Sequence, residues 1–122
     1  MARQEIRTGR AGEHFAAYLI ETAGLEASRV DGACDLHVTL LSGRILRVEV
    51  KSSKKPRGPS FRFSRGKSEA DVYALIAMSD QPLLRLQPAN LGFTRNKTIT
   101  VHVSDFTQEK QDQDLSWLLS LT

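Results

Sequence analysis

Apolar side chains recur in the first part of the chain at the spacing of a helical face. Over residues 8–24 they stand three and four positions apart, which places them on one stripe. Thr8 is a residue type that caps helix N-termini, and Gly24 suits a helix end. The pattern therefore predicts a helix over residues 8–24 whose stripe consists of Ala11, Phe15, Ala16, Leu19, Ile20 and Ala23.

Strict alternation of apolar and polar residues follows in short segments. Residues 35–40 are DLHVTL and residues 44–50 are RILRVEV, and this period of two is typical of strands with one buried face. FRF at residues 61–63 and TITVHV at residues 98–103 predict further strands. The chain is therefore expected to combine a sheet with helices.

Two later segments complete this pattern. Residues 68–78, SEADVYALIAM, fit a helix as well as a strand, but their β-branched and aromatic residues favour a strand. Because residues 79–82 read as a turn before the apolar residues 83–86, we expect a hairpin there. The tail, residues 113–122, predicts a short helix with Leu115, Leu118, Leu119 and Leu121 as its apolar residues.

The connection between the first two strands determines which of their residues face one another. A three-residue hairpin loop ending in glycine is common, because that position favours a left-handed backbone. With residues 41–43, Leu-Ser-Gly, as the loop, Asp35 stands opposite Glu49 on the same face. A two-residue loop would scatter the polar side chains over both faces. The expected register thus places two carboxylates about 4.5–5.5 Å apart at their Cβ atoms.

Two facing carboxylates repel one another unless positive charge lies between them. Lys51 shares their face, and a divalent cation is a second source of that charge. Magnesium prefers oxygen ligands, usually one or two carboxylates with waters and phosphate oxygens. Beside such an ion, a lysine can orient an attacking water or stabilise charge on a phosphate. Asp35, Glu49 and Lys51 therefore form a candidate site for phosphodiester hydrolysis.

Positive charge is concentrated directly after this site. Residues 51–67 include seven Lys or Arg and no acid, although the net charge of the chain is only +3. So dense a block favours a nucleic-acid partner over its alternative, a solvated loop. The residues expected to contact DNA are Arg10, Ser52, Lys54, Lys55, Arg57, Arg62, Arg65 and Lys67.

Length and composition indicate one ordinary domain over residues 1–122, with 40% hydrophobic and 25% charged residues. The longest apolar run, residues 72–78, is too short to cross a bilayer. Cys34 is the single cysteine, which suits a reducing compartment. We therefore expect a cytoplasmic protein without a membrane segment.

The order of the candidate residues resembles a known signature. Asp35, followed along the chain by Glu-Val-Lys at residues 49–51, is similar to the Asp…Glu-X-Lys motif of the PD-(D/E)XK nuclease superfamily. Cys34 stands where that motif has a proline, which is not a ligand. Residues 7–24 also resemble the first helix of archaeal-type Holliday junction resolvases and related phage and intron-encoded endonucleases, with Glu13 in the place of their catalytic glutamate.

This resemblance implies a restriction-endonuclease-like α/β (α+β) core, a mixed β-sheet with an N-terminal helix and flanking helices. It also implies cleavage of DNA with magnesium, for which manganese would substitute, by a protein that is prokaryotic or phage-encoded. Lys51 would act on the attacking water, and Glu13 would complete the acidic cluster. The metal ligands would be Asp35, Glu49 and the backbone carbonyl of Val50.

Several of these residues have simpler explanations. Glu49 and Lys51 are also compatible with a surface ion pair on a strand, and Glu13 with a favourable position near the helix N-terminus. His37 shares the polar face, where it either touches metal or phosphate or is an ordinary surface histidine. Trp117 fits the core or a dimer contact better than a stacking platform for bases.

The resulting hypothesis is a magnesium-dependent DNA endonuclease that acts on branched DNA like a Holliday junction resolvase. A small domain without an added sequence-reading module suits recognition of shape through phosphates. The alternatives are a sequence-specific homing or restriction-type endonuclease and a nucleic-acid-binding protein that does not cleave. Two cuts across a junction require two sites, so we expect a homodimer, for which the apolar tail offers a surface unless it packs on its own core.

Overall fold

The computed structural model describes residues 2–30, 34–64, 69–89 and 98–121, with side chains from residue 9 onward. The elements follow one another as α1 (Ala2–Thr22), β1 (Glu26–Arg29), β2 (Leu36–Thr39), β3 (Ile45–Ser53), β4 (Ser60–Ser64), β5 (Val72–Ala77), β6 (Leu83–Pro88), β7 (Thr98–His102), the short 3-10 helix η2 (Val103–Asp105) and α2 (Gln108–Ser120).

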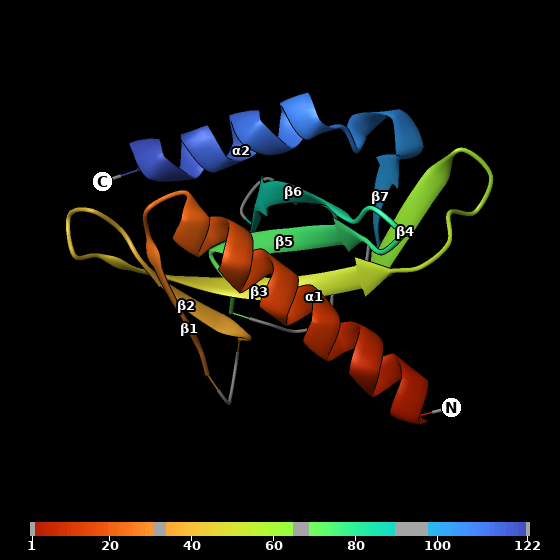
Figure 1. Ribbon diagram of the computed structural model, residues 1–122, viewed down its shortest axis with the longest axis horizontal. Helices are drawn as coiled ribbons and strands as arrows, with labels where there is room; N and C mark the ends of the chain where they lie inside the picture. The colour runs from red at the N-terminus through yellow and green to blue at the C-terminus, as the bar shows by residue number, and fades with distance from the viewer. Residues whose placement is uncertain (1, 31–33, 65–68, 90–97, 122) are drawn as a thin grey trace.

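A five-stranded sheet in the order β1-β2-β3-β5-β6 forms the centre of the fold (Figure 1). Neighbouring strands are antiparallel except β3 and β5, which run parallel. Strands β4 and β7 pair separately as an antiparallel ribbon, here called the β4–β7 ribbon. The predicted mixed sheet with an N-terminal helix and a flanking helix is confirmed.

Alternation along β3 separates two hydrophobic cores. Leu46, Val48 and Val50 belong to the larger core, which the apolar faces of α1 and α2 cover. Glu49 and Lys51 point to the opposite face, where their neighbours on β5, Tyr73 and Leu75, join the smaller core beneath the β4–β7 ribbon. Glu49 and Lys51 therefore lie on the ribbon side of the sheet.

Two predicted helices need correction, and one strand was not predicted. The first helix begins at Ala2 rather than Thr8, so Thr8 does not cap it and Glu13 lies well inside α1 instead of near its start. Strand β1 is only four residues long, too short to show as an alternation. Helix α2 begins at Gln108, where the side chain of Thr107 accepts a hydrogen bond from the Lys110 N–H group. The predicted hairpin of β5 and β6 is confirmed.

Helix α2 covers the outer edge of β6. The buried Gln111 accepts a hydrogen bond from the Leu84 N–H group at 2.9 Å, and Asp114 accepts one from the Leu86 N–H group at 2.9 Å. Trp117 is partly buried against the larger core. The tail thus packs on its own chain, which removes the reason to expect a dimer contact there.

No helix among the described residues combines the length and apolarity needed to cross a membrane.

Candidate active site

The β2–β3 hairpin has the register that the sequence predicts. His37 pairs with Arg47 and Thr39 pairs with Ile45. The predicted three-residue loop ends at Gly43, whose φ of 92° lies in the left-handed region that glycine adopts readily. This register brings the start of β2 beside the middle of β3, where the candidate residues lie.

Asp35 lies immediately before β2 and is anchored to β3. Its backbone N–H donates to the Val48 carbonyl at 3.1 Å, and its carboxylate Oδ2 accepts from the Val50 N–H group at 2.7 Å. The side chain therefore takes the place of a backbone partner where the ladder of β2 ends. This bond holds the carboxylate next to the segment that carries Glu49 and Lys51.

Glu49 and Lys51 form an ion pair on β3. The Nζ of Lys51 lies 3.4 Å from Oε2 of Glu49, and the two side chains are 25% and 16% exposed, respectively. Burial raises the pKa of Glu49, as do the charges of Asp35 and Glu13, while Lys51 opposes this rise. The site thus gathers more negative charge than its lysine offsets.

Glu13 reaches this area from α1 but has a partner that the sequence did not suggest. Its Oε1 lies 3.2 Å from Nη2 of Arg29 on β1. In the sequence, Arg29 is a single arginine at the end of a four-residue strand, and so short a strand has no recognisable pattern. Glu13 is therefore close enough to act on Glu49 electrostatically, although its own carboxylate is paired.

The described residues contain no cluster of three or more His, Cys, Asp or Glu side chains placed to hold a metal ion. Asp35, Glu49 and a backbone carbonyl form a smaller set of oxygen ligands. Magnesium commonly binds through one or two carboxylates and several waters, so this set is sufficient. The pKa of Glu49 is raised, and a cation bound beside its carboxylate would lower that pKa again. The site therefore favours cation binding. The residues present therefore fit a hard divalent ion.

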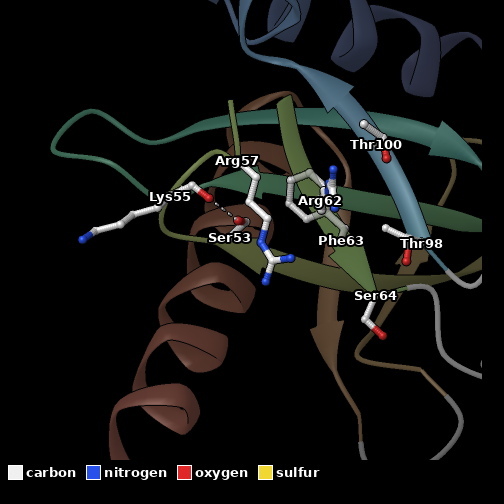
Figure 2. A pocket seen from close by; sticks show the side chains of 8 residues that line it. All are labelled: Ser53, Lys55, Arg57, Arg62, Phe63, Ser64, Thr98 and Thr100. Atoms are coloured by element: carbon white, nitrogen blue, oxygen red, sulfur yellow. Dashed lines mark hydrogen bonds between the residues drawn. The ribbon is translucent and has the colours of Figure 1, made fainter. Parts of the chain in front are cut away.

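Beyond Lys51, β3 leads into a cationic groove of about 660 Å³ (Figure 2). Ser53 contributes to its wall from the same face of β3 as Lys51. Thr98 and Thr100 come from β7. Three residues expected to contact DNA also line the groove: Lys55, Arg57 and Arg62.

The other residues expected to contact DNA are dispersed. Arg10 on α1 and Lys54 in the β3–β4 turn are exposed, and Arg65 and Lys67 lie outside the described residues. The Ser52 hydroxyl is buried beneath α1 without a hydrogen-bond partner in the described structure, so the prediction that it contacts DNA does not fit. Its side chain follows the alternation of β3 toward the larger core instead of toward the groove.

Arg62 lies on strand β4, as the pattern of residues 61–63 predicts, and its cross-strand partner is Thr100. The basic block is therefore divided between a turn and a strand of the β4–β7 ribbon.

Similarity to solved structures decides the fold. A bacterial homing endonuclease, I-Ssp6803I, is similar with a TM-score of 0.65 and 19% identity over 84% of this chain and 78% of that one. Hjc, a Holliday junction resolvase from the archaeal hyperthermophile Archaeoglobus fulgidus, is similar with a TM-score of 0.54 and 22% identity over 80% of this chain and 86% of that one. The chain therefore shares its fold with these two nuclease structures.

This nuclease fold confirms the resemblance that the sequence suggested at the level of architecture. No protein-family model matches the sequence, and no curated protein matches it. The nuclease fold places Asp35, Glu49 and Lys51 around the end of the β2–β3 ladder. Their chemical roles remain predictions.

Proposed function

We propose that this chain is a magnesium-dependent DNA endonuclease of the PD-(D/E)XK type. One observation carries the proposal: Asp35 is bonded to the backbone of β3 beside the Glu49–Lys51 pair, and a cationic groove continues from the same strand. A phosphodiester hydrolase needs acidic metal ligands, a cation beside the reacting phosphate and a surface for the polyanion. The fold shared with a homing endonuclease and a Holliday junction resolvase supports the same assignment.

The residues would divide the chemistry between them. Asp35, Glu49 and the Val50 carbonyl would hold magnesium, which supplies Lewis-acid chemistry at the phosphate when bound. The Val50 N–H group keeps the Asp35 carboxylate from turning away. The Lys51 ammonium would orient the attacking water and stabilise negative charge that develops on the phosphate oxygens.

Glu13 is proposed to support this acidic cluster from α1. Its negative charge raises the pKa of Glu49, which shows that the two carboxylates interact electrostatically. The ion pair with Arg29 leaves Glu13 available, because an exposed pair of this kind is worth only about 0–1 kcal/mol. A cation at Asp35 and Glu49 would compete with Arg29 for the carboxylate of Glu13.

Two substrate classes fit this chemistry. Branched DNA suits recognition through phosphates, which is the activity expected from the sequence. The second candidate, duplex DNA cut at a preferred sequence, is favoured by the polar outward side of the β4–β7 ribbon, where Arg62 stands opposite Thr100.

Cutting both strands of either substrate requires two sites, which a two-fold homodimer would supply. Its contact would lie away from α2, for instance at the β2–β3 hairpin, where Leu41 and Ile45 are 74% and 54% exposed.

The decisive experiment offers the protein duplex, nicked, flapped and four-way-junction DNA side by side. We expect cleavage in magnesium or manganese and none in excess chelator. Lys51→Ala serves as the matched control for a contaminating nuclease, since it should bind but not cut. DNA binding without cleavage of any substrate in either metal would instead support a non-cleaving nucleic-acid-binding protein.

A further inference from the structure

The outward side of the β4–β7 ribbon carries polar side chains only. Its inward side places Phe61 and Phe63 in the smaller core, so alternation turns the residues between them outward. On β7, the same alternation leaves Thr98 and Thr100 exposed (Figure 2). The outward side chains stand in three cross-strand rows: Ser64–Thr98, Arg62–Thr100 and Ser60–His102.

The positive charge on this surface favours an anionic partner. Lys55, Arg57 and Arg62 line the groove, and no acidic residue of the described chain joins them. Arg62 also has no ion-pair partner within the described residues, so its guanidinium is available to a ligand. The hydroxyl groups of Thr98 and Thr100 add donors and acceptors beside it. A polyanion with hydrogen-bonding edges matches this combination.

The shape and composition of the surface favour duplex over single-stranded DNA. Proteins that bind single strands stack bases on aromatic side chains, whereas the aromatic residues of this ribbon point into the core. The major groove of B-DNA, about 12 Å wide, admits a two-stranded ribbon. Arginine pairs with guanine there through two hydrogen bonds, and threonine contacts base edges or the thymine methyl group.

We propose that the outward side of the β4–β7 ribbon reads base edges in the major groove of duplex DNA. Arg62 recognises a guanine, Thr98 and Thr100 contact the neighbouring base pairs, and Lys55 and Arg57 bind the flanking phosphates. This inference rests on the proposed function and narrows its substrate to duplex DNA of preferred sequence.

The ribbon lies within reach of the candidate active site. Ser53 lines the groove and stands four residues beyond Glu49 on β3. At about 3.3 Å per residue, this spans about 13 Å. Successive base pairs rise about 3.4 Å, so the near wall of the groove lies roughly four base-pair steps from the candidate active site. The preferred sequence should therefore begin within half a helical turn of the cleavage position.

The test separates binding from cleavage by using Lys51→Ala protein in magnesium with a library of randomised duplexes. Bound duplexes are recovered and sequenced, and we expect an enriched motif that contains guanine. Arg62→Ala in the same background should lower the preference for that guanine by about 5- to 150-fold. Arg62→Lys keeps the charge but loses the paired hydrogen bonds, so it should retain binding to random DNA and still lose the preference.

Arg57→Ala is the matched control for a phosphate contact. It should weaken binding to all sequences alike, leave the motif unchanged and reduce the slope of log K against log salt by about 0.9. The inference is overturned if no motif is enriched, if the Arg62 variants leave the motif intact, or if Arg62→Ala behaves like Arg57→Ala. A wild-type protein that selects the motif yet never cuts DNA would keep this inference and refute the proposed endonuclease.

Discussion

Gly12 of α1 lies directly against Ser52 of β3. A Cβ atom built on Gly12 would stand 2.1 Å from the Ser52 Oγ and 3.4 Å from its Cβ. The absence of a side chain at Gly12 therefore allows α1 to approach the strand that carries Glu49 and Lys51. The same contact buries the Ser52 hydroxyl, which has no hydrogen-bond partner in the described structure.

We expect Gly12→Ala to destabilise the protein and Ser52→Ala to be neutral or stabilising, because the latter removes an unpaired buried hydroxyl. Ser52→Ala should also rescue Gly12→Ala by about 0.5–3 kcal/mol in a double-mutant cycle of denaturant unfolding. Gly9→Ala is the matched control, since nothing lies within 4 Å of a Cβ there. It should gain about 0.5–1 kcal/mol from helix propensity. Strictly additive effects of Gly12→Ala and Ser52→Ala would show that the close contact does not matter.

Gln111 protects the edge of β6, and its removal should be costly. Gln111→Ala would leave the Leu84 N–H group buried without its acceptor, which we expect to cost about 1–3 kcal/mol of unfolding free energy. Gln113→Ala on the same helix is the control, because that residue is exposed. Chemical denaturation measures both variants. Equal stabilities would mean that water or another group satisfies the β6 edge equally well.

Asp71 joins the start of β5 to β3 by accepting hydrogen bonds from the Arg47 backbone N–H and guanidinium at 2.9 and 3.3 Å. Burial raises the pKa of Asp71, but these bonds outweigh it and the pKa is lowered. A lowered folded-state pKa stabilises the protein above the unfolded value, near 3.9, and this contribution is lost as the pH falls through the folded-state value.

Asp71→Asn should therefore be less stable than wild type at neutral pH, by about 1 kcal/mol or less for a partly exposed pair. The difference should shrink as the pH falls below about 4. Thermal or denaturant unfolding across pH 2–7 tests this expectation, with the exposed Asp80→Asn as control. A stability difference that is independent of pH would contradict the role assigned to the Asp71 charge.

The three central site residues should be needed for cleavage but not for folding. Asp35→Asn keeps an oxygen that can accept from the Val50 N–H group, yet removes the charge of a metal ligand. We expect Asp35→Asn, Glu49→Gln and Lys51→Ala each to abolish cleavage while leaving circular dichroism and most DNA binding unchanged. Glu109→Gln, an exposed acid on α2, should cut normally. Wild-type cleavage by any of the three would refute the site assignment.

Glu13 and Arg29 give a graded test of the outer part of the site. Their exposed ion pair should contribute only about 0.2–1 kcal/mol to stability. Glu13→Gln should slow cleavage, because it removes a carboxylate that acts on Glu49. Arg29→Ala should lower the magnesium concentration needed for half-maximal cleavage, because it frees Glu13 from a competing cation. If Glu13→Gln cleaves at the wild-type rate and Arg29→Ala leaves the magnesium dependence unchanged, Glu13 has no part in the site.

The sequence by itself determined the local geometry of the site. Alternation in residues 35–40 and 44–50, with a glycine able to adopt the φ of 92° at Gly43, specified the loop and the β2–β3 register. Period-two alternation then placed Glu49 and Lys51 on one face of β3. These relationships depend on backbone geometry within a few residues, which is why they could be predicted without a fold.

Only the tertiary structure decided the contacts between segments that lie far apart in the chain. It buried Ser52 beneath Gly12, paired Glu13 with Arg29, and joined β4 to β7 so that Arg62 stands beside Thr100. None of these pairs has a local signal, because each depends on how α1, β1 and β7 pack against segments that are distant in the chain. The arrangement of the candidate catalytic residues follows from a single hairpin and its alternation. Access to the site and the surface around it follow from packing between segments that are distant in the chain.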